Sequence, residues 1–193
     1  FGGYVARCMG DGVLVYFGWP QAGEDDAERA ARAGLEVVHA VGRLQAGEQQ
    51  MRVRVGIASG LVVIGDIDGP EAVREQSVLG EAPNLAARLQ ALAQPQTVVI
   101  THATRMQIGG LFHCEDLGQL ALKGYAEPVR AWRVDGDSGV RDRFDALFAA
   151  RRSPIVGRDE EIDLLLRRWH RARDGEGRTV LIAGEPGFGK SRL

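Results

Sequence analysis

The sequence predicts an α+β domain followed by the beginning of a second, α/β unit. Three observations carry this prediction. Short apolar runs rich in β-branched residues recur through residues 1–134, and between them lie segments with helical periodicity. A polar, glycine-bearing stretch at 135–153 follows, which we expect to be a linker. Residues 154–193 then combine an amphipathic segment, a short apolar run and a glycine-rich loop, which predicts the amino-terminal part of another domain.

The first expected element is a β-hairpin. Tyr4–Cys8 and Val13–Phe17 are apolar runs on either side of Gly10-Asp11-Gly12, and Gly and Asp tolerate the backbone conformations that tight turns require. Taken alone, Asp11 therefore needs no role beyond the geometry of the turn.

A helix and a second hairpin are expected next. Asp25 precedes a segment in which small and apolar residues recur at helical spacing as far as residue 41, which predicts a helix with one buried face. Met51–Ala58 and Leu61–Gly65 then alternate as strands, and we expect them to pair around Ser59-Gly60.

A second helix is predicted around Pro83, which suits a first helical turn, with Leu85, Leu89 and Leu92 as its inward stripe. The remaining expected strands close this domain near Val134; they are Thr97–Ile100, Phe112–Leu117, Leu120–Leu122 and Val129–Val134.

The second unit is expected to open with a helix and a strand. The apolar residues of the helix share one face, at Ile162, Leu165, Leu166 and Trp169. The apolar segment Thr179–Ala183 is expected to be the strand.

Composition excludes several functions. The formal net charge of -2 gives no basic field, so we do not expect nucleic acid as a partner. Cys8 and Cys114 lie far apart in the sequence with no CxxC or His-partnered spacing, so neither a disulfide framework nor a zinc site is supported, and a reducing, cytoplasmic setting is expected. The four histidines form no metal-binding or catalytic spacing. No membrane segment or signal peptide is visible. Because the sequence begins at Phe1 and ends at Leu193, inside an expected helix, we expect it to be part of a longer protein.

A phosphate-binding loop is predicted at the end of the second unit. The segment GEPGFGKS matches the GxxxxGK[ST] pattern directly after an expected strand. Its backbone N–H groups would cradle phosphates, Lys190 would reach the outer phosphates of ATP, and Ser191 would hold Mg²⁺. The residues of this predicted site are Gly184, Gly187, Gly189, Lys190 and Ser191. This pattern predicts nucleotide binding and says nothing of hydrolysis.

A polar pair marks the second helix of the first domain. Asn84 and Arg88 are four residues apart and can reach one ligand together, although this spacing alone fits a solvated, helix-stabilising pair equally well.

Four separate segments resemble the class III nucleotidyl cyclases, the family of adenylate and guanylate cyclases. They are MGDGVLVYFG, RVGIASGLVVIGDI, VLGEAPNLAARL and LKGYAEPVRAW, in the family's order over residues 1–134. The resemblance implies a ferredoxin-like cyclase fold that lacks its first strand and helices here. Residues 154–193 resemble the start of the P-loop ATPase module that follows cyclase domains in soluble-type cyclases and related bacterial regulators.

The resemblance also implies a chemistry. In the family, the ribose 3′-hydroxyl attacks the α-phosphate and expels pyrophosphate, with two Mg²⁺ or Mn²⁺ ions held by two aspartates. Asp11 corresponds to the second aspartate, whereas the first lies upstream of Phe1 in the family. Asn84 would orient the ribose and Arg88 would stabilise charge on the α-phosphate. Arg54 and Lys123 would bind the triphosphate.

The same resemblance implies how the nucleotide base is selected and that the protein forms a homodimer. The two base-reading positions fall at Arg7 and Ser77, which match neither the Lys and Asp of many adenylate cyclases nor the Glu and Cys of many guanylate cyclases. We expect adenine over guanine, hence cyclic AMP from ATP. Because the metal aspartates and the Asn/Arg pair of one site come from different subunits in the family, a homodimer is expected.

One alternative stays open at this stage. The first domain could be a degenerate cyclase-like module that senses nucleotides or dimerises and so controls the ATPase. Arg7 and Ser77 favour this alternative, whereas Asp11, Asn84 and Arg88 oppose it. In either case we expect residues 1–193 alone to be inactive, because one carboxylate cannot hold two metal ions.

Overall fold

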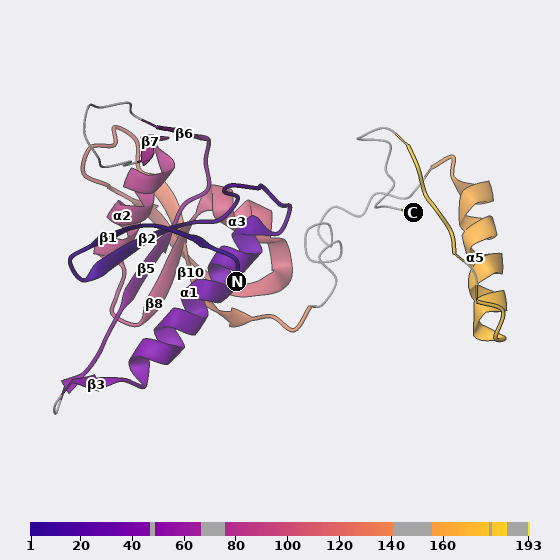
Figure 1. Cartoon of the computed structure of the whole chain (residues 1–193), viewed down its shortest axis with the longest axis horizontal. Helices are drawn as coiled ribbons and strands as arrows, with labels where there is room; N and C mark the ends of the chain where they lie inside the picture. Colours follow the sequence, from indigo (N-terminus) through magenta and orange to yellow (C-terminus); the bar gives the residue numbers. More distant parts are fainter. Residues whose placement is uncertain (47–48, 67–75, 141–155, 178, 185–192) are drawn as a thin grey trace. The chain divides into compact units, whose positions relative to one another are not determined.

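The computed structural model describes residues 1–46, 49–66, 76–140, 156–177, 179–184 and 193, and the chain divides into two compact units, Phe1–Leu147 and Phe148–Leu193 (Figure 1). The described strands all belong to the first unit: β1 (Tyr4–Met9), β2 (Gly12–Tyr16), β3 (Gln45–Ala46), β4 (Gln49–Gln50), β5 (Arg54–Ile57), β6 (Val62–Asp66), β7 (Gln76–Gly80), β8 (Thr97–Thr101), β9 (Phe112–Leu120) and β10 (Val129–Asp137). Its helical elements are α1 (Asp26–Gly42), α2 (Ala82–Leu92), α3 (His102–Ile108) and the 3₁₀ turn η1 (Gly109–Leu111).

A mixed four-stranded sheet forms the centre of this unit, in the order β5-β8-β10-β9. β5 runs parallel to β8, and the other neighbours are antiparallel. Side chains alternate between the two faces of β8, so Val98 and Ile100 pack with α1 and α3, whereas Val99 packs with α2. Helices therefore cover both faces of the sheet (Figure 1), and the predicted α+β class is confirmed.

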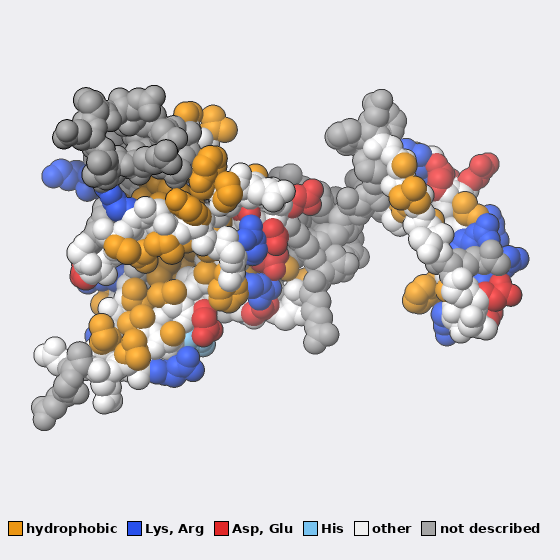
Figure 2. Space-filling view, viewed as in Figure 1, with side chains coloured by type: hydrophobic (Ala, Val, Ile, Leu, Met, Phe, Trp, Pro, Cys, Tyr) orange, Lys and Arg blue, Asp and Glu red, His pale blue; other side chains and the backbone are white. Residues whose placement is uncertain are grey.

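Besides the short β3–β4 pair, two ribbons are separate from the central sheet in the described part of the chain. Among the residues that the structure describes, β1 pairs only with β2, and β6 pairs only with β7. Apolar side chains reach the surface on both, since Val13 is 60% and Val63 61% exposed. Figure 2 shows apolar side chains exposed over the visible face of the first unit.

Gln96 fixes the start of β5 against α1. Its side-chain oxygen accepts a hydrogen bond from the Val53 backbone N–H at 2.7 Å, and its amide nitrogen donates one to the Val38 carbonyl oxygen at 3.1 Å. The Gln96 backbone N–H also donates to the Val53 carbonyl oxygen, at 2.7 Å. This single residue thus satisfies backbone groups of two elements that the core brings together.

The predicted second hairpin is wrong. Arg54–Ile57 pairs in parallel with β8, and Val62–Asp66 pairs with Gln76–Gly80 instead. Ser59 lies in a connection that is tied to α3, because its hydroxyl hydrogen-bonds to that of Thr104 at 2.9 Å. Local alternation predicts that a segment is a strand, but the partner is chosen by burial of apolar side chains between distant segments.

Two smaller predictions also need correction, and one helix was not predicted. Leu92 is 55% exposed, so the inward face of α2 consists of Leu85 and fully buried Leu89. Phe112–Leu120 is one continuous strand, and Leu122 lies beyond it in a turn. The sequence analysis also missed α3, a short helix whose amino terminus is capped by the Thr101 hydroxyl.

The second unit contains the predicted helix, α5 (Asp159–Arg173). Its apolar face is open, since Trp169 is 60% exposed. The predicted strand Thr179–Ala183 has no strand partner among the described residues, and a strand needs one to exchange hydrogen bonds. Most of the predicted phosphate loop, including Gly187, Gly189, Lys190 and Ser191, lies outside the described residues; Gly184 is described and exposed.

A search of the described residues finds no helix with the length and apolar character that crossing a membrane requires.

Candidate functional site

The helix α2 presents two of the predicted site residues on its outer side. Pro83 lies in its first turn, where a missing N–H costs nothing, and Leu89 anchors its inner side in the core. Asn84 and Arg88 are both exposed and lie one helical turn apart on one face. Neither side chain has a hydrogen bond or ion pair with a described residue, so both are available to a ligand.

Gly56 sets the position of α2 over the sheet. A Cβ atom at Gly56 would overlap the Ala86 carbonyl oxygen and lie 2.5 Å from the Gln90 backbone nitrogen. At Gly60, a Cβ atom would lie 3.3 Å from the Ala82 side chain. The helix therefore runs antiparallel to β5 and rests directly on its backbone, an approach that only glycine allows. Sequence analysis did not identify this role of Gly56, although a glycine inside a strand was its signal.

A packed turn brings Lys123 to the same helix. The Tyr125 backbone N–H donates to the Leu122 carbonyl oxygen at 3.1 Å, which closes the turn around Lys123. The side chains of Leu122 and Tyr125 pack into the cluster that contains Leu89, whereas Lys123 is exposed. The structure thus places Lys123 on a turn that packs against the helix of Asn84 and Arg88.

Burial and the charged side chains of Glu81 and Arg88 affect the pKa of Tyr125. Burial raises the pKa of its phenol, as does the carboxylate of Glu81 to a smaller extent, whereas the positive charge of Arg88 lowers it. Tyr125 and Leu85, the residue next to Asn84 on α2, pack against the same apolar cluster.

The predicted site cations are not neutralised within the described part of the chain. Arg54 is exposed on β5 and, by strand alternation, shares the α2 face of the sheet with Gly56. Arg54, Arg88 and Lys123 form no ion pair with a described residue. Other arginines of this unit do pair with carboxylates, at Arg29, Arg32, Arg43, Arg130 and Arg133. Cations without an internal partner are suited to hold an anionic ligand.

Asp11 occupies the tip of the β1–β2 ribbon. Gly10 adopts a φ of 61°, which glycine tolerates, and a Cβ atom there would meet nothing within 4 Å. Asp11 and Arg7 are both exposed, and no described strand pairs this ribbon with the central sheet. No hydrogen bond or ion pair joins Asp11 to a described residue of α2.

A divalent metal would find one suitable ligand at this tip. Carboxylate oxygen is the donor that Mg²⁺ and Mn²⁺ prefer, and the Asp11 carboxylate is open to solvent. Among the described residues, however, no group of three or more His, Cys, Asp or Glu side chains could surround a metal ion. Asp11 therefore fits as one contributor to a metal site and not as a complete site.

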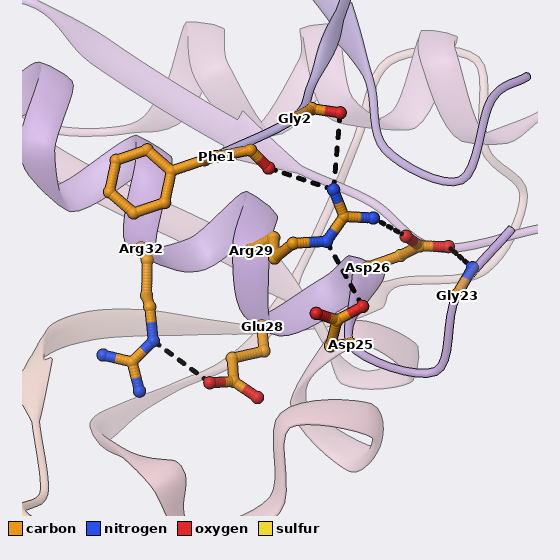
Figure 3. A network of polar contacts seen from close by, with 8 residues as sticks. All are labelled: Phe1, Gly2, Gly23, Asp25, Asp26, Glu28, Arg29 and Arg32. Atoms are coloured by element: carbon orange, nitrogen blue, oxygen red, sulfur yellow. Dashed lines mark hydrogen bonds and ion pairs between the residues drawn. The ribbon is translucent and has the colours of Figure 1, made fainter. Parts of the chain in front are cut away.

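Arg29 holds the base of the ribbon on α1 (Figure 3). Its guanidinium donates to the carbonyl oxygens of Phe1 and Gly2, at 3.0 and 3.3 Å. It also pairs with Asp25 at 3.3 Å and with Asp26. The residues that lead into β1 are thereby tied to the first turn of α1, a contact that sequence analysis did not anticipate.

Ser77 lies on β7, where its backbone is opposite Gly65. This strand leads directly into the turn that begins α2, so the predicted base-reading position and the Asn84/Arg88 pair are joined by a short stretch of chain.

Residues 3–136 match the adenylate and guanylate cyclase catalytic domain, and the chain belongs to this family. The predicted resemblance is therefore confirmed for the first unit. Residues 154–193 match an AAA ATPase domain.

Solved cyclase domains share the fold. The adenylyl cyclase CyaB from P. aeruginosa is 30% identical with a TM-score of 0.59, covering 69% of this chain and 71% of that one. The guanylyl cyclase Cya2 is 31% identical with a TM-score of 0.63, covering 73% and 74%. The guanylate cyclase domain of RhGC from Catenaria anguillulae, solved with GTP, is 23% identical with a TM-score of 0.65, over 70% and 74% of the two chains, and supports the fold alone.

Relatives among known sequences include both kinds of cyclase. The protein R02095 of Rhizobium meliloti, described as uncharacterized, is 36% identical over 99% of this chain and 19% of its own length. The receptor-type adenylate cyclase GRESAG 4.3 of Trypanosoma brucei brucei is 34% identical over 57% of this chain and 9% of its own. The receptor-type guanylate cyclase gcy-28 of Caenorhabditis elegans is 27% identical over 67% and 10%. The chain thus spans about a fifth or less of the length of these relatives.

Proposed function

We propose that the first unit forms cyclic AMP from ATP, as part of a cytoplasmic signalling protein. The observation that carries this proposal is the exposed set Asn84, Arg88 and Lys123, which lie on one helix and the turn packed against it and have no described internal partners. In this family of cyclases, such a set faces a nucleoside triphosphate.

The proposed reaction is a single displacement at the α-phosphorus. The ribose O3′ forms a bond to the α-phosphorus, its proton passes to water, and the bond from that phosphorus to the bridging oxygen of pyrophosphate breaks. Asn84 holds the ribose by hydrogen bonds from its amide, so that O3′ lies in line with the leaving group. Arg88 donates to the α-phosphate oxygens, where negative charge increases in the transition state.

Binding of the triphosphate is assigned to the remaining cations. Lys123 and Arg54 would hold its outer phosphates by charge-assisted hydrogen bonds. Asp11 would hold a divalent metal through a carboxylate oxygen, and such a metal supplies positive charge to the phosphates when bound. Because Asp11 lies on a ribbon apart from the sheet, we propose that it serves the α2 of a second copy of this chain. The exposed Val5 and Val13 of the ribbon support such a homodimer.

Adenine is the proposed base because no acidic residue occupies either base-reading position. Arg7 can donate to adenine N1, and the Ser77 hydroxyl can accept from the adenine amino group. Guanine presents donors at N1 and N2 and would need an acidic acceptor.

This choice of base is tested by kcat/KM for ATP and GTP, measured on the full-length protein with Mg²⁺ or Mn²⁺. We expect a moderate preference for ATP, and we expect Ser77→Ala to reduce it, because a hydroxyl acceptor is weaker than a carboxylate but still contributes. A clear preference for GTP, or a selectivity that does not respond to Ser77→Ala, would refute the assignment.

The second unit is proposed to bind ATP at Gly184, Gly187, Gly189, Lys190 and Ser191 and to regulate the cyclase. The match of residues 154–193 to an AAA ATPase domain supports this part of the proposal. ATP affinity of the complete ATPase module, compared with that of its Lys190→Ala variant, tests it, and equal affinities would exclude the site.

A degenerate, nucleotide-sensing first unit is the second candidate. The departure of Arg7 and Ser77 from both family patterns favours it. A folded, dimeric full-length protein that makes no cyclic nucleotide with either metal would select this candidate over the first.

A further inference from the structure

One face of α2 carries more than the two predicted ligand-binding residues. Glu81, Asn84 and Arg88 are exposed and spaced at i, i+3 and i+7, which places them along one side of the helix, next to the inward-facing Leu85. Tyr125 packs against the cluster that Leu85 and Leu89 line, and the charges of Glu81 and Arg88 both reach its phenol. Tyr125 therefore shares an apolar cluster with Leu85, the residue that follows Asn84 on α2.

The same tyrosine closes the turn that presents Lys123. Leu122 is only 5% exposed, and the Tyr125 backbone donates to its carbonyl oxygen at 3.1 Å. Lys123 therefore stands between two anchored neighbours while its own side chain is exposed. A lysine side chain is flexible, so its ammonium group can meet a phosphate reproducibly only if its backbone is held in place.

We propose that Tyr125 is a positioning residue, which fixes the Lys123 turn on α2 so that Lys123 and Arg88 engage the same triphosphate. This inference rests on the proposed function. The ring, rather than the hydroxyl, is assigned the positioning role, because Tyr125 packs against the apolar cluster that contains Leu89 of α2.

The test measures KM and kcat of the full-length protein for ATP. It also measures the Kd of inorganic triphosphate, in the Lys190→Ala background so that phosphate binding by the second unit is removed. Tyr125→Ala is expected to raise KM and this Kd about tenfold with a smaller change in kcat, because Lys123 binds substrate and transition state alike. Tyr125→Phe should restore wild-type values.

A double-mutant cycle separates positioning from general destabilisation. In the Lys123→Ala background, Tyr125→Ala should change KM by less than about twofold, because its effect passes through Lys123. Leu117→Ala is the control, since Leu117 packs into the same cluster away from the turn; it should lower the Tm without raising KM. Should Tyr125→Ala fail to fold, Tyr125→Leu replaces it.

The inference would be overturned if the effects of Tyr125→Ala and Lys123→Ala on KM multiplied in the double variant. It would also be overturned if Tyr125→Phe raised KM as much as Tyr125→Ala does. A wild-type protein that makes no cyclic nucleotide contradicts the proposed function instead. In that case the Kd of inorganic triphosphate, compared between Tyr125→Ala and Tyr125→Phe, still tests whether Tyr125 positions Lys123.

Discussion

Replacing Arg88 with alanine is expected to lower kcat for cyclic nucleotide formation by about 100- to 1,000-fold, the usual cost of removing a donor to developing transition-state charge. Because Arg88 is exposed and makes no hydrogen bond with a described residue, the Tm of the protein should stay the same. The measurement is a steady-state assay of the full-length variant together with its thermal unfolding.

Two further variants sharpen this prediction. Arg88→Lys keeps the charge but loses the planar fork, so its kcat should lie between those of the wild type and Arg88→Ala. Arg52→Ala removes another exposed arginine that we do not place in the site, and it should leave kcat unchanged. An Arg88→Ala variant that retains more than about a tenth of wild-type kcat would remove Arg88 from the catalytic machinery.

Gly56→Ala is expected to be the most disruptive small substitution in the first unit. The new Cβ would overlap the backbone of α2 at Ala86 and Gln90, and a backbone cannot rotate away as a side chain can. We expect a loss of stability at or above the upper end of the usual overpacking cost, about 3 kcal/mol. Cyclase activity should fall as well, because the displaced helix carries Asn84 and Arg88.

Gly60→Ala is the matched control for this prediction. Its Cβ would lie 3.3 Å from the Ala82 side chain, a contact that a shift of a few tenths of an ångström relieves. Thermal unfolding and activity are measured for both variants. Equal Tm values for Gly56→Ala and the wild type would contradict the close approach of α2 to β5.

The sequence predicted the local elements better than their partners. The β1–β2 ribbon, α1 and α2 follow from short-range patterns, namely the Gly-Asp-Gly turn, helical periodicity and a proline in a first turn. The parallel pairing of β5 with β8 joins segments about forty residues apart, with registers such as Arg54↔Thr97, and no local pattern encodes it.

The residues of the candidate site also fall into two groups, those that the sequence identifies and those that only tertiary contacts identify. Asn84, Arg88 and Lys123 are found in the sequence because they lie in segments that resemble the cyclases. The residues that position them, Gly56 and Tyr125, act through contacts between β5, α2 and the turn after β9. Such contacts depend on tertiary packing, so only the structure identifies them.

In the proposed homodimer, one site combines Asp11 of one subunit with Asn84 and Arg88 of the other. This arrangement is tested most directly by co-expressing Asp11→Ala and Arg88→Ala full-length chains, each inactive alone, and assaying the mixed protein for cyclic nucleotide. In a mixed dimer one site carries both substitutions and the other carries neither, and half of randomly formed dimers are mixed, so about a quarter of wild-type activity should return. Mixed dimers that are folded but show no recovery would contradict the account, as would full activity of Asp11→Ala alone.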